Sequence, residues 1–99
     1  MIVSISCGPL HSVALSSKGR IFSCGFGKNY CLGHNETHVL NEFKEIKTNI
    51  KVDQVECGLS CTAILSYGKV YLVGKLGSTI YKTFTQIVTY EDIRDVKVS

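Results

Sequence analysis

The chain has 99 residues, about the length of one small domain. Eleven Lys and Arg residues against eight Asp and Glu leave a formal charge of +3, which is too small to predict nucleic-acid or membrane binding from charge alone. Charged residues make up 19% of the chain, below the ~25% typical of globular domains, and this composition excludes a disordered tail and a coiled coil.

The N-terminal segment and the cysteines bear on the cellular compartment. No run of 18 apolar residues occurs, so we expect no transmembrane helix and no insertion into a membrane. The opening segment MIVSISCGPLHS lacks the basic and apolar regions of a secretory signal. We therefore expect an intracellular protein, cytoplasmic or nuclear, whose odd number of thiols stays reduced and packs as small hydrophobic residues. These thiols belong to Cys7, Cys24, Cys31, Cys57 and Cys61.

Short strands bounded by glycine turns dominate the local pattern. Ser17-Lys18-Gly19 predicts a three-residue hairpin loop and Tyr67-Gly68 a two-residue loop, each ending in the residue that best tolerates a positive φ. Residues 90–94 are the one helical candidate, and they are too few to form a persuasive helix. The runs rich in β-branched and aromatic residues predict strands at 12–15, 20–24, 61–66 and 69–73.

The chain also repeats itself. Residues 4–25 align with residues 54–74 at an offset of 50, which becomes 49 after the shorter turn. A second register, at an offset of 41, aligns Phe43 with Phe84 and continues as far as Val98. Short strands that repeat in units of roughly 40–50 residues predict propeller blades. We expect a single partial domain over 1–99, with one repeat at about 1–51 and the next at about 52–99.

The repeated residues resemble a known family. Its core is Gly-x-x-His-(Ser/Thr)-x-Ala-Leu, followed by a Gly hairpin, an aromatic-x-Trp-Gly strand and a Gln-Leu-Gly turn. The first repeat of this chain reads Cys7-Gly8-x-x-His11-Ser12-Val13-Ala14-Leu15, then Gly19-Arg20-Ile21-Phe22-x-x-Gly25-x-Gly27-x-Asn29, then Leu32-Gly33. This pattern is similar to the regulator of chromosome condensation repeat, and the resemblance implies blades of a seven-bladed β-propeller.

The second repeat departs from that pattern. Cys61 stands where the family has His, and the Leu-Gly turn falls in a deletion. Cys24 and Val73 occupy the usual Trp position. We expect an all-β fold of about two blades with short antiparallel strands in an open, incomplete ring. Two blades cannot close a ring, so their end faces should expose apolar side chains that favour self-association or further blades.

His11 and the cysteines are the residues whose chemistry suggests a site. His11 could be a base or a ligand, but we expect its ring to lie between strands and to bond backbone. The pairs Cys7-x-x-x-His11 and Cys57-x-x-x-Cys61 have spacings that zinc sites use. They are equivalent positions of two repeats, however, so we expect them on different blades and expect no metal. A thiol nucleophile, Cys31 or Cys61, with a histidine base is an alternative, but five Cys and three His in 99 residues make such pairs common by chance.

Three other features are weaker candidates. The run Gly25–Tyr30 begins like a dinucleotide loop, but it lacks the third glycine and the following helix. Lys44, Lys47 and Lys51 have only Phe43 beside them, so direct nucleic-acid binding is not expected. Residues 28–42, with His34 and His38 near the middle, form the longest segment without a strand pattern, and we expect a surface loop there. The acidic residues at 91, 92 and 95 are expected to be solvated.

These observations favour one function over two others. We expect a non-catalytic protein-interaction or scaffold module, part of a larger propeller, that uses no cofactor and has no catalytic, cofactor-binding or metal-binding residue. The resemblance implies an alternative: guanine-nucleotide exchange on, or regulation of, a small GTPase by a complete propeller. The partner is then a protein, a small GTPase in the alternative, or further blades. An enzymatic interpretation has only the thiols to support it.

Overall fold

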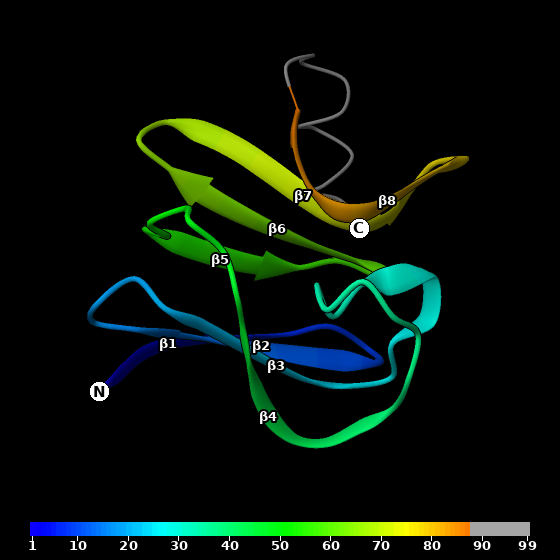
Figure 1. Cartoon of the computed structure of the whole chain (residues 1–99), viewed down its shortest axis with the longest axis horizontal. Helices are drawn as coiled ribbons and strands as arrows, with labels where there is room; N and C mark the ends of the chain where they lie inside the picture. The colour runs from blue at the N-terminus through cyan, green and yellow to red at the C-terminus, as the bar shows by residue number, and fades with distance from the viewer. Residues whose placement is uncertain (88–99) are drawn as a thin grey trace.

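The computed structural model describes residues 1–87, which form two four-stranded antiparallel sheets (Figure 1). The strands of each sheet follow one another in chain order, so each sheet is a meander with its first strand at one edge. This arrangement confirms the expected all-β fold of two blades in an open array. The first sheet contains β1 (Ile2–Cys7), β2 (His11–Ser16), β3 (Ile21–Gly25) and β4 (Leu40–Ile46), and the second contains β5 (Gln54–Cys57), β6 (Cys61–Ser66), β7 (Lys69–Leu76) and β8 (Thr79–Ile87).

The hairpin turns lie where the glycines predict them. Gly19 has a φ of +80°, and the β6–β7 turn has φ values of +50° at Tyr67 and +76° at Gly68. Positive φ at both central residues of a two-residue loop matches the right-handed twist of the flanking strands. The four predicted strands are confirmed as β2, β3, β6 and β7; β6 has the predicted bounds, and the ends of the others differ by at most three residues.

The pairing of strands shows the repeat in three dimensions. His11 pairs with Gly25 in the first sheet, and Cys61 pairs with Gly74 in the second. Both glycines have φ above +100°, and a Cβ on either would run into the carbonyl of the residue before its partner. The register of the outer strand shifts at the same place in both sheets, next to these glycines. Glycine is therefore required at the same point of each blade.

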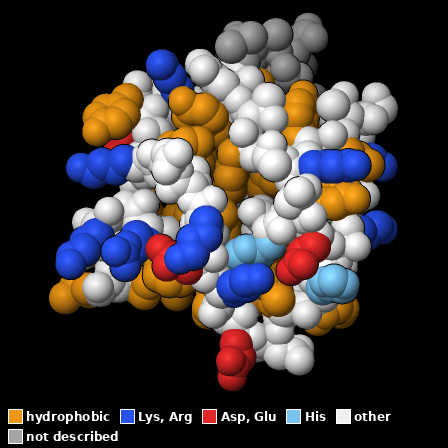
Figure 2. Space-filling view, viewed as in Figure 1, with side chains coloured by type: hydrophobic (Ala, Val, Ile, Leu, Met, Phe, Trp, Pro, Cys, Tyr) orange, Lys and Arg blue, Asp and Glu red, His pale blue; other side chains and the backbone are white. Residues whose placement is uncertain are grey.

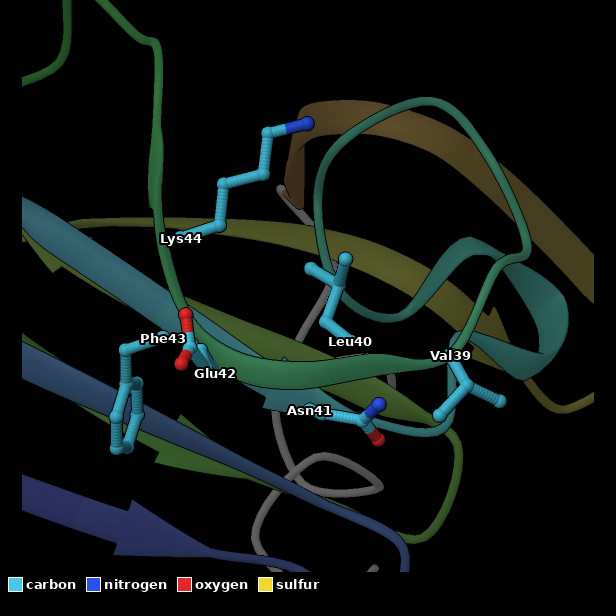
Figure 3. A pocket seen from close by; sticks show the side chains of 6 residues that line it. All are labelled: Val39, Leu40, Asn41, Glu42, Phe43 and Lys44. Atoms are coloured by element: carbon cyan, nitrogen blue, oxygen red, sulfur yellow. The ribbon is translucent and has the colours of Figure 1, made fainter.

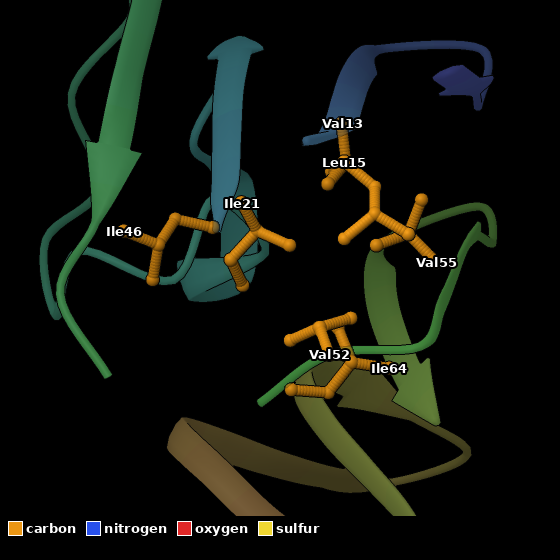
Figure 4. Close-up of a cluster of buried hydrophobic side chains, with 7 residues drawn as sticks. All are labelled: Val13, Leu15, Ile21, Ile46, Val52, Val55 and Ile64. Carbon is orange, nitrogen blue, oxygen red and sulfur yellow. The ribbon is translucent and has the colours of Figure 1, made fainter. Parts of the chain in front are cut away.

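The two sheets pack face to face around one hydrophobic cluster (Figure 4). Side chains of this cluster come from the first sheet, from the β4–β5 connector and from the second sheet. Each fully buried aliphatic side chain stabilises the fold by about 1.5–3 kcal/mol, so this cluster is the main cohesive contact between the blades. The cluster contains Val13, Leu15, Ile21, Ile46, Val52, Val55 and Ile64.

The other face of each sheet is also apolar. On the second sheet, a cluster including Cys61, Leu72 and Ile87 packs with Val70 and Tyr81. On the first sheet, Ile5 of β1 is 58% exposed. Each blade therefore carries apolar side chains on both faces, which is what a repeat needs when it has a neighbour on each side.

Three of the sequence predictions fall beyond residue 87. The short helical candidate at 90–94, the acidic residues at 91–95 and the end of the second register, up to Val98, lie outside the described residues. In residues 1–87 the structure contains no helix with the length and apolar character needed to cross a bilayer.

Candidate functional site

A buried hydrogen-bond chain crosses the seam between the two blades. The Nε2 atom of His11, on β2, lies 2.8 Å from the Oγ1 atom of Thr62, on β6. The Thr62 hydroxyl donates to the carbonyl oxygen of Cys31 at 2.7 Å. All three residues are almost completely buried. These two hydrogen bonds therefore join the first blade, the second blade and the loop between β3 and β4.

This geometry determines the tautomer of His11. The Thr62 hydroxyl has a single hydrogen, and the Cys31 carbonyl can only accept, so that hydrogen points to Cys31. Thr62 must then accept from His11, which places the imidazole hydrogen on Nε2. The Nδ1 atom is buried with no hydrogen-bond partner among the described residues. Burial lowers the pKa of His11 from 6.5, so the ring is neutral at physiological pH.

The position of His11 differs in one detail from the expectation. The ring does lie between the strands of two blades, but its partner is a side-chain hydroxyl and not the backbone. Thr62 passes the interaction on to the backbone of Cys31. Sequence reasoning missed Thr62, although the repeat alignment holds the signal: Thr62 and Ser12 occupy the Ser/Thr position of the repeated motif. The hydroxyl at this position of the second repeat accepts a hydrogen bond from the histidine of the first repeat.

A second contact between the blades involves Ser6 and Cys57. The backbone N–H of Cys57 donates to the Ser6 hydroxyl at 3.0 Å, and the Cys57 thiol lies 3.1 Å from the Ser6 carbonyl oxygen, to which it donates. The loops beside this contact stack so closely that a Cβ on Gly8 would run into the Gly58 carbonyl. Burial raises the pKa of the Cys57 thiol to about 11.

The candidate metal and nucleophile residues do not form a reactive centre in the described part of the chain. Cys7 is exposed and accepts a hydrogen bond from Ser12 at 3.3 Å. Among residues 1–87, no group of three or more His, Cys, Asp or Glu residues could hold a metal ion. Burial raises the pKa of Cys31 to about 11 and also raises the pKa of Cys61. Both thiols are therefore protonated at neutral pH and are poor nucleophiles.

The segment expected to be a surface loop is partly buried. Near its N-terminal end, Cys31 and Leu32 are each only 1% exposed and lie against the seam. The Cys31 thiol donates to the Phe26 carbonyl at 3.3 Å, which folds the loop back on itself. The end of the segment is also corrected, because β4 begins at Leu40. Apolar packing between the blades explains the difference: the loop fills the space that the short strands leave at the seam.

The histidines of this loop have structural partners. His34 Nε2 lies 3.1 Å from the Ser23 hydroxyl, which itself donates to the Leu32 carbonyl at 2.7 Å. Desolvation and the charge of Lys44 lower the pKa of His34. His38 Nδ1 lies 3.3 Å from a Glu36 carboxylate oxygen on the exposed side of the loop. These contacts hold the loop in place and bring no two histidines together on one ligand site.

The glycine-rich run at 25–30 shapes the backbone. Gly25 lies at the register shift of the first sheet, and Gly27 packs against the His38 carbonyl. A short 3-10 helix, η1 (Lys28–Tyr30), follows, and Asn29 and Tyr30 within it have φ values of +58° and +68°. The Lys82 ammonium lies 5.4 Å from the centre of the Tyr30 ring, so the run contacts β8 of the second blade.

A shallow surface depression of about 590 Å³ lies along β4 (Figure 3). Six consecutive residues, Val39 to Lys44, line it, and the register of β4 shifts over the same stretch. A site that encloses a small ligand usually draws side chains from several elements. This depression has side chains from one continuous segment only, Val39 and the first five residues of β4, so it is a bend in the outer strand and not an enclosed pocket.

The fold and the seam define a class of protein: a pair of β-propeller blades joined by apolar packing and a buried polar chain. A family model described as the Regulator of chromosome condensation (RCC1) repeat matches residues 2–31, and a second model of the same description matches residues 18–65. The chain belongs to the RCC1 repeat family, as the sequence motif indicated.

Similar proteins are much longer than this chain. The mouse (Mus musculus) protein named probable E3 ubiquitin-protein ligase HERC4 is 40% identical over 82 residues, which are 78% of this chain and 8% of that protein. The crystal structure of human WBSCR16 matches with a TM-score of 0.79 and 22% identity over 91% of this chain. That of Prp20p from Saccharomyces cerevisiae matches with a TM-score of 0.77 and 21% identity over 92% of this chain. This chain spans only 26% of each of the two solved chains.

Proposed function

We propose that the chain is a non-catalytic protein-interaction module whose two blades work next to further blades. The general role as a repeat scaffold follows from membership of the RCC1 repeat family. The proposal goes further, because it assigns no reaction to the chain itself. The raised pKa values of the buried thiols and the neutral, engaged His11 support it.

The observation that carries the proposal is the apolar outer face of the first sheet. Ser6 bonds Cys57 of the second blade, so its neighbour Ile5 on β1 points away from that blade. Ile5 pairs with Ala14, and Ala14 pairs with Phe22, which forms an apolar row across three strands. Ile5 is 58% exposed, whereas Ala14 is 3% exposed and Phe22 is half-buried, so the β1 end of the row is the part without cover within the described residues. A neighbouring blade, from the same polypeptide or another copy, is the cover that this surface fits.

Sedimentation of the full chain over a range of concentrations tests this proposal. We expect the average mass to rise with concentration, and we expect the Ile5→Asp variant to lower the degree of association at least severalfold. Tyr67→Asp is the matched control, because Tyr67 is 76% exposed but sits on a turn. A monodisperse wild-type monomer with a concentration-independent unfolding transition would contradict the proposal.

The second candidate function is regulation of a small GTPase by nucleotide exchange, carried out by a complete propeller to which these blades contribute. The observation that favours it is the similarity to Prp20p, whose crystal structure is reported together with its binding to Gsp1p and histones. Nucleotide-release rates of small GTPases test it. Acceleration by catalytic amounts of the chain would support exchange activity, and unchanged rates would leave the scaffold function as the better account.

A further inference from the structure

Three segments form one surface at the edge of the two sheets. Two hydrogen bonds join the β2–β3 turn, the β4–β5 connector and the β6–β7 turn: the Val52 N–H donates to the Gly19 carbonyl at 3.4 Å, and the Tyr67 N–H donates to the Asp53 carboxylate at 3.0 Å. We call this surface the turn face and define it as residues 17–20, 45, 47–53 and 67–69. Figure 2 shows Lys and Arg side chains gathered on the left of the molecule, where Figure 1 places these turns.

The turn face carries the whole charge excess of the chain. It has five cationic residues and two carboxylates, an excess of three, and the net charge of all 99 residues is +3. The remaining six cationic residues and six carboxylates of the sequence balance one another. The cationic side chains of the turn face are all exposed, and they belong to Lys18, Arg20, Lys47, Lys51 and Lys69.

The carboxylates of the turn face neutralise these cations only in part. Glu45 is shared between Arg20 at 3.8 Å and Lys47 at 3.7 Å. Asp53 accepts the Tyr67 backbone N–H. Within residues 1–87, no ion pair joins Lys18 or Lys51 to a carboxylate. The surface therefore presents positive charge on turns that hydrogen bonds hold in place, which reduces the entropy lost on binding.

We propose that the turn face binds an acidic segment of a partner protein, one rich in Asp and Glu. This inference rests on the proposed function and names the chemistry of one partner. Complementary charge accelerates encounter and selects among partners, and the effect falls with ionic strength. Four of the five cations are Lys, whose compact ammonium groups pair with carboxylates without the fixed bidentate geometry of Arg.

The same surface fits nucleic acid less well. Glu45 and Asp53 lie among the cations and would face a continuous line of phosphates. Tyr67 is the exposed aromatic residue of the turn face, and one ring makes no platform for successive bases. An extended peptide can place carboxylates against the lysines and other side chains opposite Glu45 and Asp53.

Binding of a fluorescein-labelled peptide of ten glutamates to the full chain, followed by fluorescence anisotropy at low salt, tests the proposal. The variant Lys18→Gln, Arg20→Gln, Lys47→Gln, Lys51→Gln should bind at least about tenfold more weakly than the wild type. A matched variant, Lys28→Gln, Lys44→Gln, Lys75→Gln, Lys82→Gln, loses the same four charges at exposed positions outside the turn face. It should bind within about twofold of the wild type, and salt should weaken binding of the wild type.

Three results would overturn the proposal. They are equal weakening in both variants, which would reduce the effect to net charge; no binding by chains that circular dichroism shows to be folded; and tighter binding of a DNA duplex of about 20 base pairs through the same four residues. Sedimentation separates this proposal from the scaffold proposal, because the turn-face variant should still associate through the face that contains Ile5. Wild-type chains that associate but do not bind the peptide would therefore count against the turn-face proposal alone.

Discussion

Thr62→Val is the substitution that probes the seam most directly. Valine has nearly the shape of threonine but lacks the hydroxyl, so the apolar packing around the position is retained. The change removes the acceptor of the His11 Nε2–H and the donor to the Cys31 carbonyl in one step. Both groups then remain buried with one fewer partner, because the space at residue 62, which is fully buried, admits no solvent.

The expected cost follows from those two lost bonds. Leaving a buried donor or acceptor unpaired costs about 1–3 kcal/mol. Two such groups at the seam should therefore lower the free energy of unfolding by about 2–6 kcal/mol, a large fraction of the ~5–15 kcal/mol typical of a domain. With a urea m-value of about 2 kcal/mol/M, the midpoint should fall by roughly 1–3 M.

Urea titration followed by circular dichroism measures this change. Thr85→Val is the matched control: the Thr85 hydroxyl is exposed and donates to the Thr83 carbonyl of its own strand. Its cost should stay within about 0.5 kcal/mol. Thr62→Ser restores the hydroxyl and should recover most of the loss. Equal midpoints for Thr62→Val and Thr85→Val would show that the hydrogen bonds from His11 through Thr62 to Cys31 do not stabilise the seam.

The remaining predictions concern pH, a glycine and the thiols. Burial lowers the pKa of His11 below 6.5, so His11 takes up a proton at a higher pH in the unfolded chain than in the folded one. The urea midpoint should therefore be highest above pH 6.5 and decline as the pH falls to the folded-state pKa. The midpoint of the His11→Gln variant should depend less on pH. Gly25→Ala should lower the free energy of unfolding by at least about 2 kcal/mol in the same titration, because its Cβ meets the Leu10 carbonyl. Gly68→Ala has open space around its Cβ and should lower that free energy by about 1 kcal/mol. Similar losses for the two variants would refute the steric argument. A thiol reagent at about pH 7.5 should modify the exposed Cys7 in the native chain. It should modify Cys31, which is buried and whose pKa is raised to about 11, only after unfolding. Peptide mass mapping distinguishes the two thiols, and labelling of Cys31 in the native chain would contradict its burial.

Most of the fold could be predicted from local features of the chain. Runs rich in β-branched and aromatic residues, bounded by glycine turns, placed β2, β3, β6 and β7 within a few residues. The hairpins followed from Gly19 and from Tyr67-Gly68, where positive φ is required. These features depend on each residue and its close neighbours, so they can be recognised without knowing what the sheets pack against.

The contents of the seam were harder to predict. Cys31 and Leu32 lie in a segment with no periodic pattern, and nothing local marks them as buried. Thr62 could have been found only by combining the repeat alignment with the assumption that one blade bonds the next. The turn face was missed for the same reason, since Lys18 and Lys51 come together only when two turns meet.

By itself the sequence determined four of the eight described strands, the hairpin turns, the repeat and the family of this protein, because strand-forming composition, glycine turns and repeated motifs can be recognised along the chain. The tertiary structure alone decided which polar groups meet. His11 and Thr62 are 51 residues apart, and their hydrogen bond depends on how two sheets pack face to face. Packing on that scale is a sum over many weak contacts, and it also sets the neutral tautomer of His11 and gathers the excess charge at one edge of the blades.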